Sequence, residues 1–234
     1  MPIRRLRCLF VALALAALAG GAAAADLAGR MRLTDHGKPS ADRSLDPHQA
    51  VVVFEPLGEK PPATAASAPP PKPIEVQMLT VRKEFEPRVV IVPVGSIVRF
   101  PNQDPILHNV FSVSGRNAFD LGLVGSGRGK TAIFREAGLV RVYCNVHHAM
   151  YGFVFVAAGP YYAQPDKNGD FRLAHLPDGP GRITFWHERG DVAVREVTLP
   201  LKGPLTLEVE ITQPRVPAHK NKFGKSYSAG GNYG

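Results

Sequence analysis

Cysteine is the residue that this sequence has least of after tryptophan. The 234 residues hold two, Cys8 and Cys144, so at most one internal disulfide can form. Helix-period apolar stretches are hard to find after residue 25, and no later run is apolar and long enough to span a membrane. These absences exclude a disulfide framework, and they disfavour a helical fold and a helical membrane protein.

The first 25 residues have the pattern of a secretory signal peptide. Three arginines among the first seven residues precede an apolar run over 8–18, and alanines at 23–25 provide a cleavage site. We therefore expect export to the periplasm or beyond. Cleavage would remove Cys8 and leave Cys144 as an unpaired thiol in an oxidising compartment, where such a thiol needs a functional reason.

The charge balance is basic. The formal net charge of +8 falls to about +5 when the three arginines of the signal peptide are removed. A positive surface favours acidic partners, such as a negatively charged redox protein. Nucleic acid is not an expected partner in this compartment.

Turn-forming residues are abundant, with 23 glycines and 22 prolines, and they separate short β-rich runs. The clearest strands are expected at 51–54, 88–92, 97–100, 139–144 and 205–211. The last of these alternates strictly between apolar and polar residues. The sequence therefore predicts an all-β protein.

Two segments lack the composition of a folded core. Residues 59–75 form a connector rich in proline and alanine, with six prolines between 61 and 73. Residues 214–234 are basic and rich in glycine, and we expect a flexible tail there. The remaining residues divide into 26–58, 76–158 and 159–213.

The residues that carry chemistry lie close together around the only cysteine of the mature chain. His147 and Met150 follow Cys144 at +3 and +6, and His108 lies 36 residues before it. By composition, a histidine and a methionine at these two offsets occur by chance about once in 1,700. Strand alternation turns Cys144 to the inside with Val142. Two imidazoles, a thiolate and a weak thioether are the ligand set of a type 1 copper site.

These motifs resemble the cupredoxins. The Cys-x2-His-x2-Met loop is similar to that of amicyanins, and His108-Asn-Val resembles plastocyanin-like proteins described as methylamine utilization proteins; the likeness covers 76–158. It implies a Greek-key β-barrel or sandwich with one copper held by His108, Cys144, His147 and Met150. It also implies that Asn109 hydrogen-bonds across to the cysteine loop as an outer-shell residue. Relatives commonly carry proline beside the loop histidine, whereas here His148 follows it as a rival ligand.

The flanking blocks resemble a carboxypeptidase-regulatory-like (transthyretin-like) β-sandwich. The likeness rests on 29–39 and 51–54 before the central segment and on the turns at 166–171 and 176–179 after it. It implies one sandwich split into 26–58 and 159–213, with the cupredoxin domain inserted in it or preceding its larger part. Strands near 30 and 52 should then pair with strands after 170.

The function that these features predict is one-electron transfer by a periplasmic blue copper protein, with redox proteins as donor and acceptor. An apolar rim of Ile106, Leu107, Val146, Ala149 and Tyr151 would surround the edge of His147. No catalytic constellation and no His-x-His pair stands out, so an enzyme is not expected. The alternatives are a protein for copper binding or delivery, and an exported interaction module without redox turnover.

Overall fold

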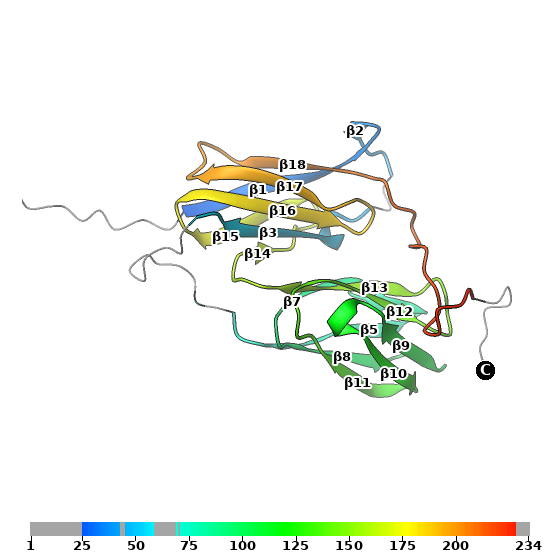
Figure 1. Cartoon of the computed structure of the whole chain (residues 1–234). Helices are drawn as coiled ribbons and strands as arrows, with labels where there is room; N and C mark the ends of the chain where they lie inside the picture. The colour runs from blue at the N-terminus through cyan, green and yellow to red at the C-terminus, as the bar shows by residue number, and fades with distance from the viewer. Residues whose placement is uncertain (1–24, 43–44, 59–68, 70, 228–234) are drawn as a thin grey trace, which may run out of the picture.

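The computed structural model describes residues 25–42, 45–58, 69 and 71–227. The predicted signal peptide, apart from Ala25, and most of the predicted connector lie outside these residues. The described chain is all-β, as predicted, and its four sheets stack as two sandwiches (Figure 1). No helix among the described residues is long and apolar enough to cross a membrane.

The first sandwich takes its strands from both ends of the chain. One sheet has the order β15-β1-β18 with β2 beside β1, and the other has the order β14-β3-β16-β17. Its strands are β1 (Ala25–Asp35), β2 (Lys38–Pro39), β3 (Ala50–Pro56), β14 (Tyr162–Ala163), β15 (Asp170–Leu176), β16 (Gly179–His187), β17 (Ala193–Leu199) and β18 (Leu205–Glu210). A short 3-10 helix, η1 (Pro47–Gln49), precedes β3.

The second sandwich comes from the stretch between β3 and β14. Its sheets have the orders β10-β9-β12-β13-β7 and β11-β8-β5-β6, with β4 beside β8. Its strands are β4 (Glu75–Gln77), β5 (Leu79–Val81), β6 (Glu84–Glu86), β7 (Val89–Pro93), β8 (Ile97–Asn102), β9 (His108–Ser112), β10 (Phe119–Val124), β11 (Gly127–Ile133), β12 (Gly138–Cys144) and β13 (Tyr151–Ala157). The 3-10 helix η2 (Gly115–Asn117) lies before β10.

The expected pairing across the central segment is present. β1 pairs antiparallel with β15 and parallel with β18, and β3 pairs antiparallel with β16. The strands before residue 57 therefore close their sheets with strands after residue 161. This placement leaves the second sandwich as an excursion between two adjacent strands of the first.

The continuous apolar run of β3 follows from its position between the two sandwiches. Ala50, Val52 and Phe54 pack into the core of the first sandwich, while Val51 and Val53 face the second. A strand that is covered on both faces needs apolar residues at every position, because neither face meets water. The absence of alternation at 51–54 thus marks a central layer of the molecule.

An apolar interface joins the two sandwiches. Its members are Val51, Val53, Val89, Phe111, Tyr143, Tyr151, Phe153 and Trp186. The ring centroids of Phe153 and Trp186 lie 4.9 Å apart in an edge-to-face arrangement. A partly buried ion pair between Arg88 and Glu188, 3.1 Å long, lies at the margin of the same interface.

Replacing Trp186 with alanine is expected to lower the free energy of unfolding by about 3 kcal/mol, because the change leaves a cavity between the sandwiches. Urea unfolding followed by circular dichroism measures the loss. Val194→Ala is the matched control, since Val194 lies on the neighbouring strand with 56% of its surface exposed. Equal midpoints for the two variants would contradict a stabilising role of the interface.

His187 is a buried neutral imidazole at the end of β16. Its Nε2 donates to the carbonyl of Asp46 at 3.0 Å, and its Nδ1 accepts the N–H of Arg189 at 3.1 Å. Burial lowers the pKa of His187 to about 4. Protonation would place a charge in the core and remove the acceptor at Nδ1.

The low pKa of His187 predicts a loss of stability in mild acid. The unfolded chain binds this proton near pH 6.5 and the folded chain only near pH 4, so the stabilisation is complete above pH 6.5 and disappears as the pH falls to about 4. The loss amounts to about 3 kcal/mol. Urea unfolding at pH 7 and pH 4.5 measures it. His187→Gln cannot titrate, so an equally steep decline in this variant would contradict the assignment.

The C-terminal segment differs from the expected flexible tail over 214–227. The ring of His219 stacks on that of Tyr143 with centroids 4.0 Å apart and an interplanar angle of 6°. Lys222 Nζ pairs with Asp120 at 2.8 Å. The segment runs from β18 to the end of the second sandwich (Figure 1). Composition gave no sign of this because every partner lies far away in the sequence.

Candidate metal centre

Strand pairing places His108 beside Cys144. His108 begins β9 and Cys144 ends β12, and these antiparallel strands match Cys144 with Val110. Residues two apart on a strand share a face, and directly paired residues of neighbouring strands do too. The side chain of His108 therefore lies on the same face of the sheet as those of Val110 and Cys144. Both side chains are fully buried. The first residue of β9 and the last residue of β12 are thus two of the predicted ligands.

A short loop brings the third predicted ligand back to them. The N–H of Met150 donates to the carbonyl of His147 at 3.0 Å, and the N–H of Cys144 donates to the carbonyl of Met150 at 3.1 Å. These bonds close the loop between β12 and β13, which turns the His147 ring towards Cys144. Met150 itself is buried in the same core cluster as Cys144.

Three ligand atoms converge. The Sγ of Cys144 lies 3.6 Å from His108 Nδ1 and 3.8 Å from His147 Nδ1, and the two nitrogens are 3.2 Å apart. The circle through a triangle with these sides has a radius of about 2.1 Å, close to the roughly 2.0–2.3 Å at which imidazole and thiolate bind Zn²⁺. One ion in the plane of these atoms would therefore reach all three.

Burial affects the pKa of the Cys144 thiol and that of the His147 imidazole in opposite directions. Burial raises the pKa of the Cys144 thiol, while the N–H groups of Asn109, His147 and Val146 act in the opposite direction. Burial also lowers the pKa of His147, which favours the neutral ring that a metal requires. A buried sulfur that faces amide donors and two imidazole nitrogens is a donor set that could hold a metal cation, which would favour the thiolate over the thiol.

Asp104 holds the far side of the His108 ring, and the sequence reasoning missed it. Its Oδ2 lies 2.8 Å from His108 Nε2. Burial alone would raise the pKa of Asp104, but hydrogen bonds from the Lys83 N–H, the His108 ring and the Arg82 N–H outweigh it and keep the carboxylate ionised. A carboxylate at Nε2 keeps the proton there and leaves Nδ1 free as a ligand. The only signal in the sequence was an acid four residues before the histidine.

Asn109 differs in part from its predicted role. Its backbone carbonyl does accept the N–H of Asn145, at 2.9 Å, in the cysteine loop. Its side chain, however, donates to Asp120 Oδ1 at 2.6 Å and to the Gly122 carbonyl at 3.0 Å. The Asn109 side chain therefore links β9 to β10 and makes none of these bonds to the cysteine loop.

His148 lies outside the convergent group. It is exposed, and its ring centroid is 6.0 Å from that of Tyr227. The described residues hold one other possible metal-binding group, made of Asp35, His36 and Glu210, and all three are exposed. In the group of His108, Cys144 and His147, the first two residues are buried and His147 is partly buried.

No family model matches the chain, and no curated protein matches it. Solved structures match part of it. A reduced tryptophan-to-tyrosine mutant of amicyanin is 26% identical, with a TM-score of 0.34 over 36% of this chain and 82% of that one. A purple cupredoxin from Nitrosopumilus maritimus is 25% identical, with a TM-score of 0.31 over 35% and 98%. The Cu(I) form of a methionine-to-alanine mutant of amicyanin is 25% identical, with a TM-score of 0.34 over 45% and 99%. The TM-scores are low, so the chemistry of the site is inferred from its own residues.

Proposed function

We propose that this protein is a periplasmic type 1 copper protein that carries single electrons between redox partners. The observation that carries the proposal is the buried triangle of two imidazole nitrogens and one thiol sulfur. Two imidazoles, a thiolate and a weak thioether are the donor set of blue copper sites, and Met150, buried in the same core cluster as Cys144, would supply the thioether. When bound, copper supplies a reversible one-electron couple between Cu(II) and Cu(I).

The protein's own contribution is to hold the donors still. Asp104 and the paired strands β9 and β12 fix His108 and Cys144, and the hydrogen bonds of the loop fix His147. Full burial of Cys144 and His108 keeps water from the donor set. A fixed donor set costs little reorganisation when the charge changes, which suits electron transfer better than release of the ion.

A route for electrons is expected at the edge of His147, which is only partly buried. Of the residues expected in the apolar rim, Ile106 is 37% and Leu107 is 52% exposed, and Ala149, two residues after His147, is exposed too. Small apolar rims of this kind support weak, short-lived encounters. Tyr151, which the sequence placed in the rim, is instead buried in the interface between the sandwiches.

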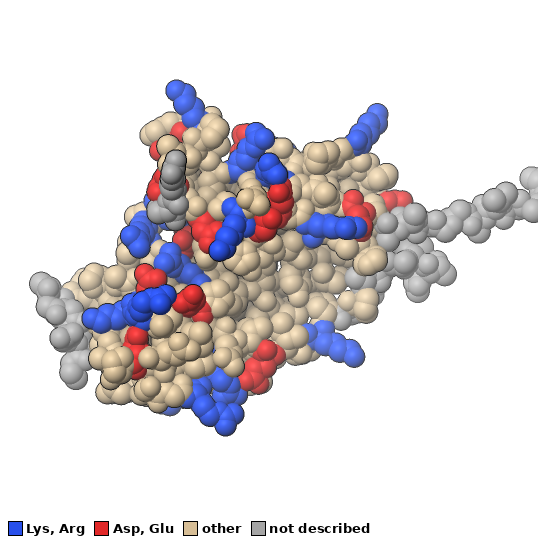
Figure 2. All heavy atoms as spheres, turned by 180° about the vertical axis from the view of Figure 1, so that it is seen from behind, with Lys and Arg blue, Asp and Glu red and all other residues tan. Residues whose placement is uncertain are grey.

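Basic side chains lie next to the rim. A cavity of about 300 Å³ beside Met150 is lined by four basic residues and one acid: Arg82, Lys83, Arg88, Arg215 and Glu84. Arg82 and Arg88 are paired with Glu86 and Glu188, so Lys83 and Arg215 carry most of the local positive charge. On the face seen in Figure 2, Lys and Arg are interspersed with Asp and Glu and form no continuous field. Local attraction at the rim, acting over about 8–10 Å at moderate ionic strength, therefore favours an acidic partner.

The local charge predicts how small oxidants behave. Ferricyanide, an anion, is expected to oxidise the reduced protein more slowly as salt is added, and a cationic cobalt complex more quickly. Lys83→Glu should weaken the salt effect, and Lys167→Glu, at an exposed turn of the first sandwich, should leave it unchanged. Stopped-flow absorbance gives the rates. Identical salt dependence for both oxidants would argue against a charged docking site.

The proposal is tested by loading the purified protein with Cu(II). An intense blue colour that ascorbate bleaches and ferricyanide restores is the expected result, and a Zn²⁺-loaded sample is the colourless control. Copper binding without colour or redox cycling would favour a copper delivery protein. Failure to bind copper would leave an exported interaction module.

A further inference from the structure

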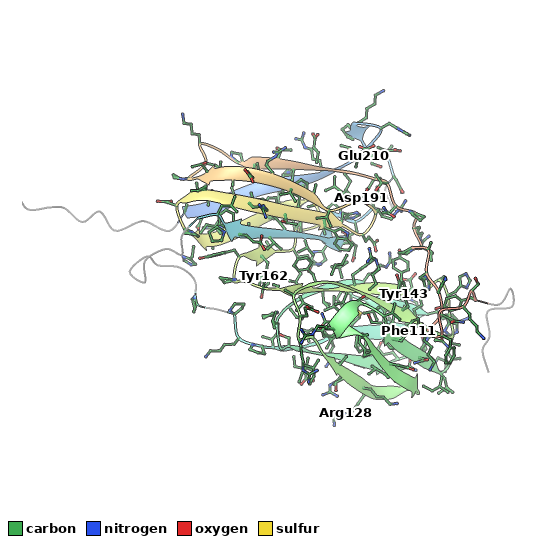
Figure 3. The ribbon with its side chains drawn as sticks, in the orientation of Figure 1. Phe111, Arg128, Tyr143, Tyr162, Asp191 and Glu210 are labelled. Carbon is green, nitrogen blue, oxygen red and sulfur yellow. The ribbon has the colours of Figure 1, made fainter. Side chains whose placement is uncertain are left out.

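The C-terminal segment contacts β12 directly and is linked to β9 through Asp120 of β10. It meets β12 and its loop through Cys144 and Asn145, and it meets the surroundings of β9 through Asp120. In Figure 3, Tyr143 lies at the end of the second sandwich that this segment approaches. Nothing in the ligand motif requires this additional cover.

The contacts to the cysteine loop involve backbone atoms of the loop and a buried amide. The hydroxyl of Tyr227 donates to the carbonyl of Cys144 at 3.1 Å. The N–H of Lys222 donates to Asn145 Oδ1 at 3.0 Å, and Asn145 is buried. These two bonds hold the residue that would bind copper and the residue after it.

The contact to β9 passes through one carboxylate. Lys222 Nζ lies 2.8 Å from Asp120 Oδ2, and Asp120 Oδ1 accepts the Asn109 side chain at 2.6 Å. Asn109 follows His108 directly. A single lysine of the segment thus bonds to the cysteine loop through its N–H and is linked to the histidine strand through its ammonium group.

The segment is shaped for these contacts by its own turn. Asn221 is buried, and its Oδ1 accepts the N–H groups of Phe223 and Lys225, each at 3.0 Å. The N–H of Asn221 in turn donates to the carbonyl of Lys225 at 2.9 Å. The closed turn presents Lys222 to the sandwich, and the stack of His219 on Tyr143 fixes where the turn begins.

We propose that residues 219–227 form a clamp that positions Cys144 and its loop, and that the clamp and the metal stabilise each other. The inference rests on the proposed copper function. His219, Lys222 and Tyr227 act as positioning residues, since they contact the backbone and neighbours of the predicted ligands and none of the ligand atoms. Coupling between two sites is reciprocal, so a clamp that tightens metal binding must itself be tightened by the metal.

The test compares the wild type with a double variant, Lys222→Gln with Tyr227→Phe, in the full chain. These changes remove the ion pair with Asp120 and the hydroxyl donor to Cys144 and alter little else. Lys225→Gln is the charge-matched control, because its side chain is exposed in the same turn. Circular dichroism and thermal unfolding of the metal-free proteins establish that all three fold.

Four measurements test the clamp: Cu(I) affinity, hydrogen exchange, the Cu(II) spectrum and the reduction potential. Competition with a Cu(I) chelator should show affinity reduced on the order of 10-fold in the double variant and unchanged in the control. Hydrogen exchange in the wild type should be slower at the Lys222 N–H when Zn²⁺ is bound than in the metal-free protein. The expected factor is also on the order of 10-fold, because the coupling is reciprocal. The Cu(II) spectrum and the reduction potential should shift in the double variant alone.

Different results would contradict the clamp and the proposed copper function. Wild-type affinity and spectrum in the double variant, or no metal-dependent protection of the Lys222 N–H in the wild type, would overturn the clamp while the copper site stands. A wild type that binds no copper would remove the proposed function and the clamp with it.

Discussion

Replacing Cys144 with serine is expected to abolish the visible absorption of the Cu(II)-loaded protein completely and to weaken copper binding by several orders of magnitude. Serine keeps the size and position of the side chain, and His108 and His147 remain. A hydroxyl in this buried position does not ionise, however, so the strongest of the three donors and its charge-transfer absorption disappear. Absorption spectroscopy and a chelator competition measure both effects.

The two adjacent histidines supply an internal control for this result. His147→Ala should bleach the colour as Cys144→Ser does, since its Nδ1 is one corner of the triangle. His148→Ala should leave it intact, because that ring is exposed and lies near Tyr227. A loss of colour in His148→Ala with a wild-type spectrum in His147→Ala would show that the loop presents the other imidazole.

The sequence predicted this donor group because local rules govern it. Alternation along β12 turns Cys144 inward, and a short loop after a strand end has few ways to place His147. The pairing of the outer strands was implied by the resemblance of the flanking blocks to a transthyretin-like sandwich, and the structure has it. The resemblance supplied what local rules could not, because β1 and β15 pair residues as far apart as Arg30 and Asp170.

Features that depend on distant partners were not predictable in the same way. The stack of His219 on Tyr143 joins residues 76 positions apart, and polar, glycine-rich composition gave no sign of it. The burial of Tyr151 depends on the first sandwich, which packs against this face of the second. Asn109 was expected to bond to the loop, and its backbone carbonyl does, but its side chain bonds to β10, because a residue's position fixes its strand and not its rotamer.

Asp104 belongs to the same class, and it leads to the second large prediction. Asp104→Asn is expected to weaken copper binding by about 10- to 100-fold, the usual effect of removing an outer-shell partner. Asparagine can still accept the His108 Nε2–H through its oxygen, so the ring stays oriented, while the negative charge and the acceptor for the Arg82 N–H are lost. Losing that charge disfavours Cu(II) more than Cu(I), so the reduction potential should rise.

Asp104→Ala separates orientation from charge. This variant removes the acceptor as well, and it frees the N–H groups of Arg82 and Lys83 from their shared carboxylate. It should lose more affinity than Asp104→Asn and broaden the copper spectrum, because the His108 ring is no longer held in one tautomer and one orientation. Voltammetry and titration with a chelator give the two quantities. If Asp104→Asn kept the wild-type potential and affinity, the carboxylate would act only as a support for the 82–83 turn, and His108 would be held by strand packing alone.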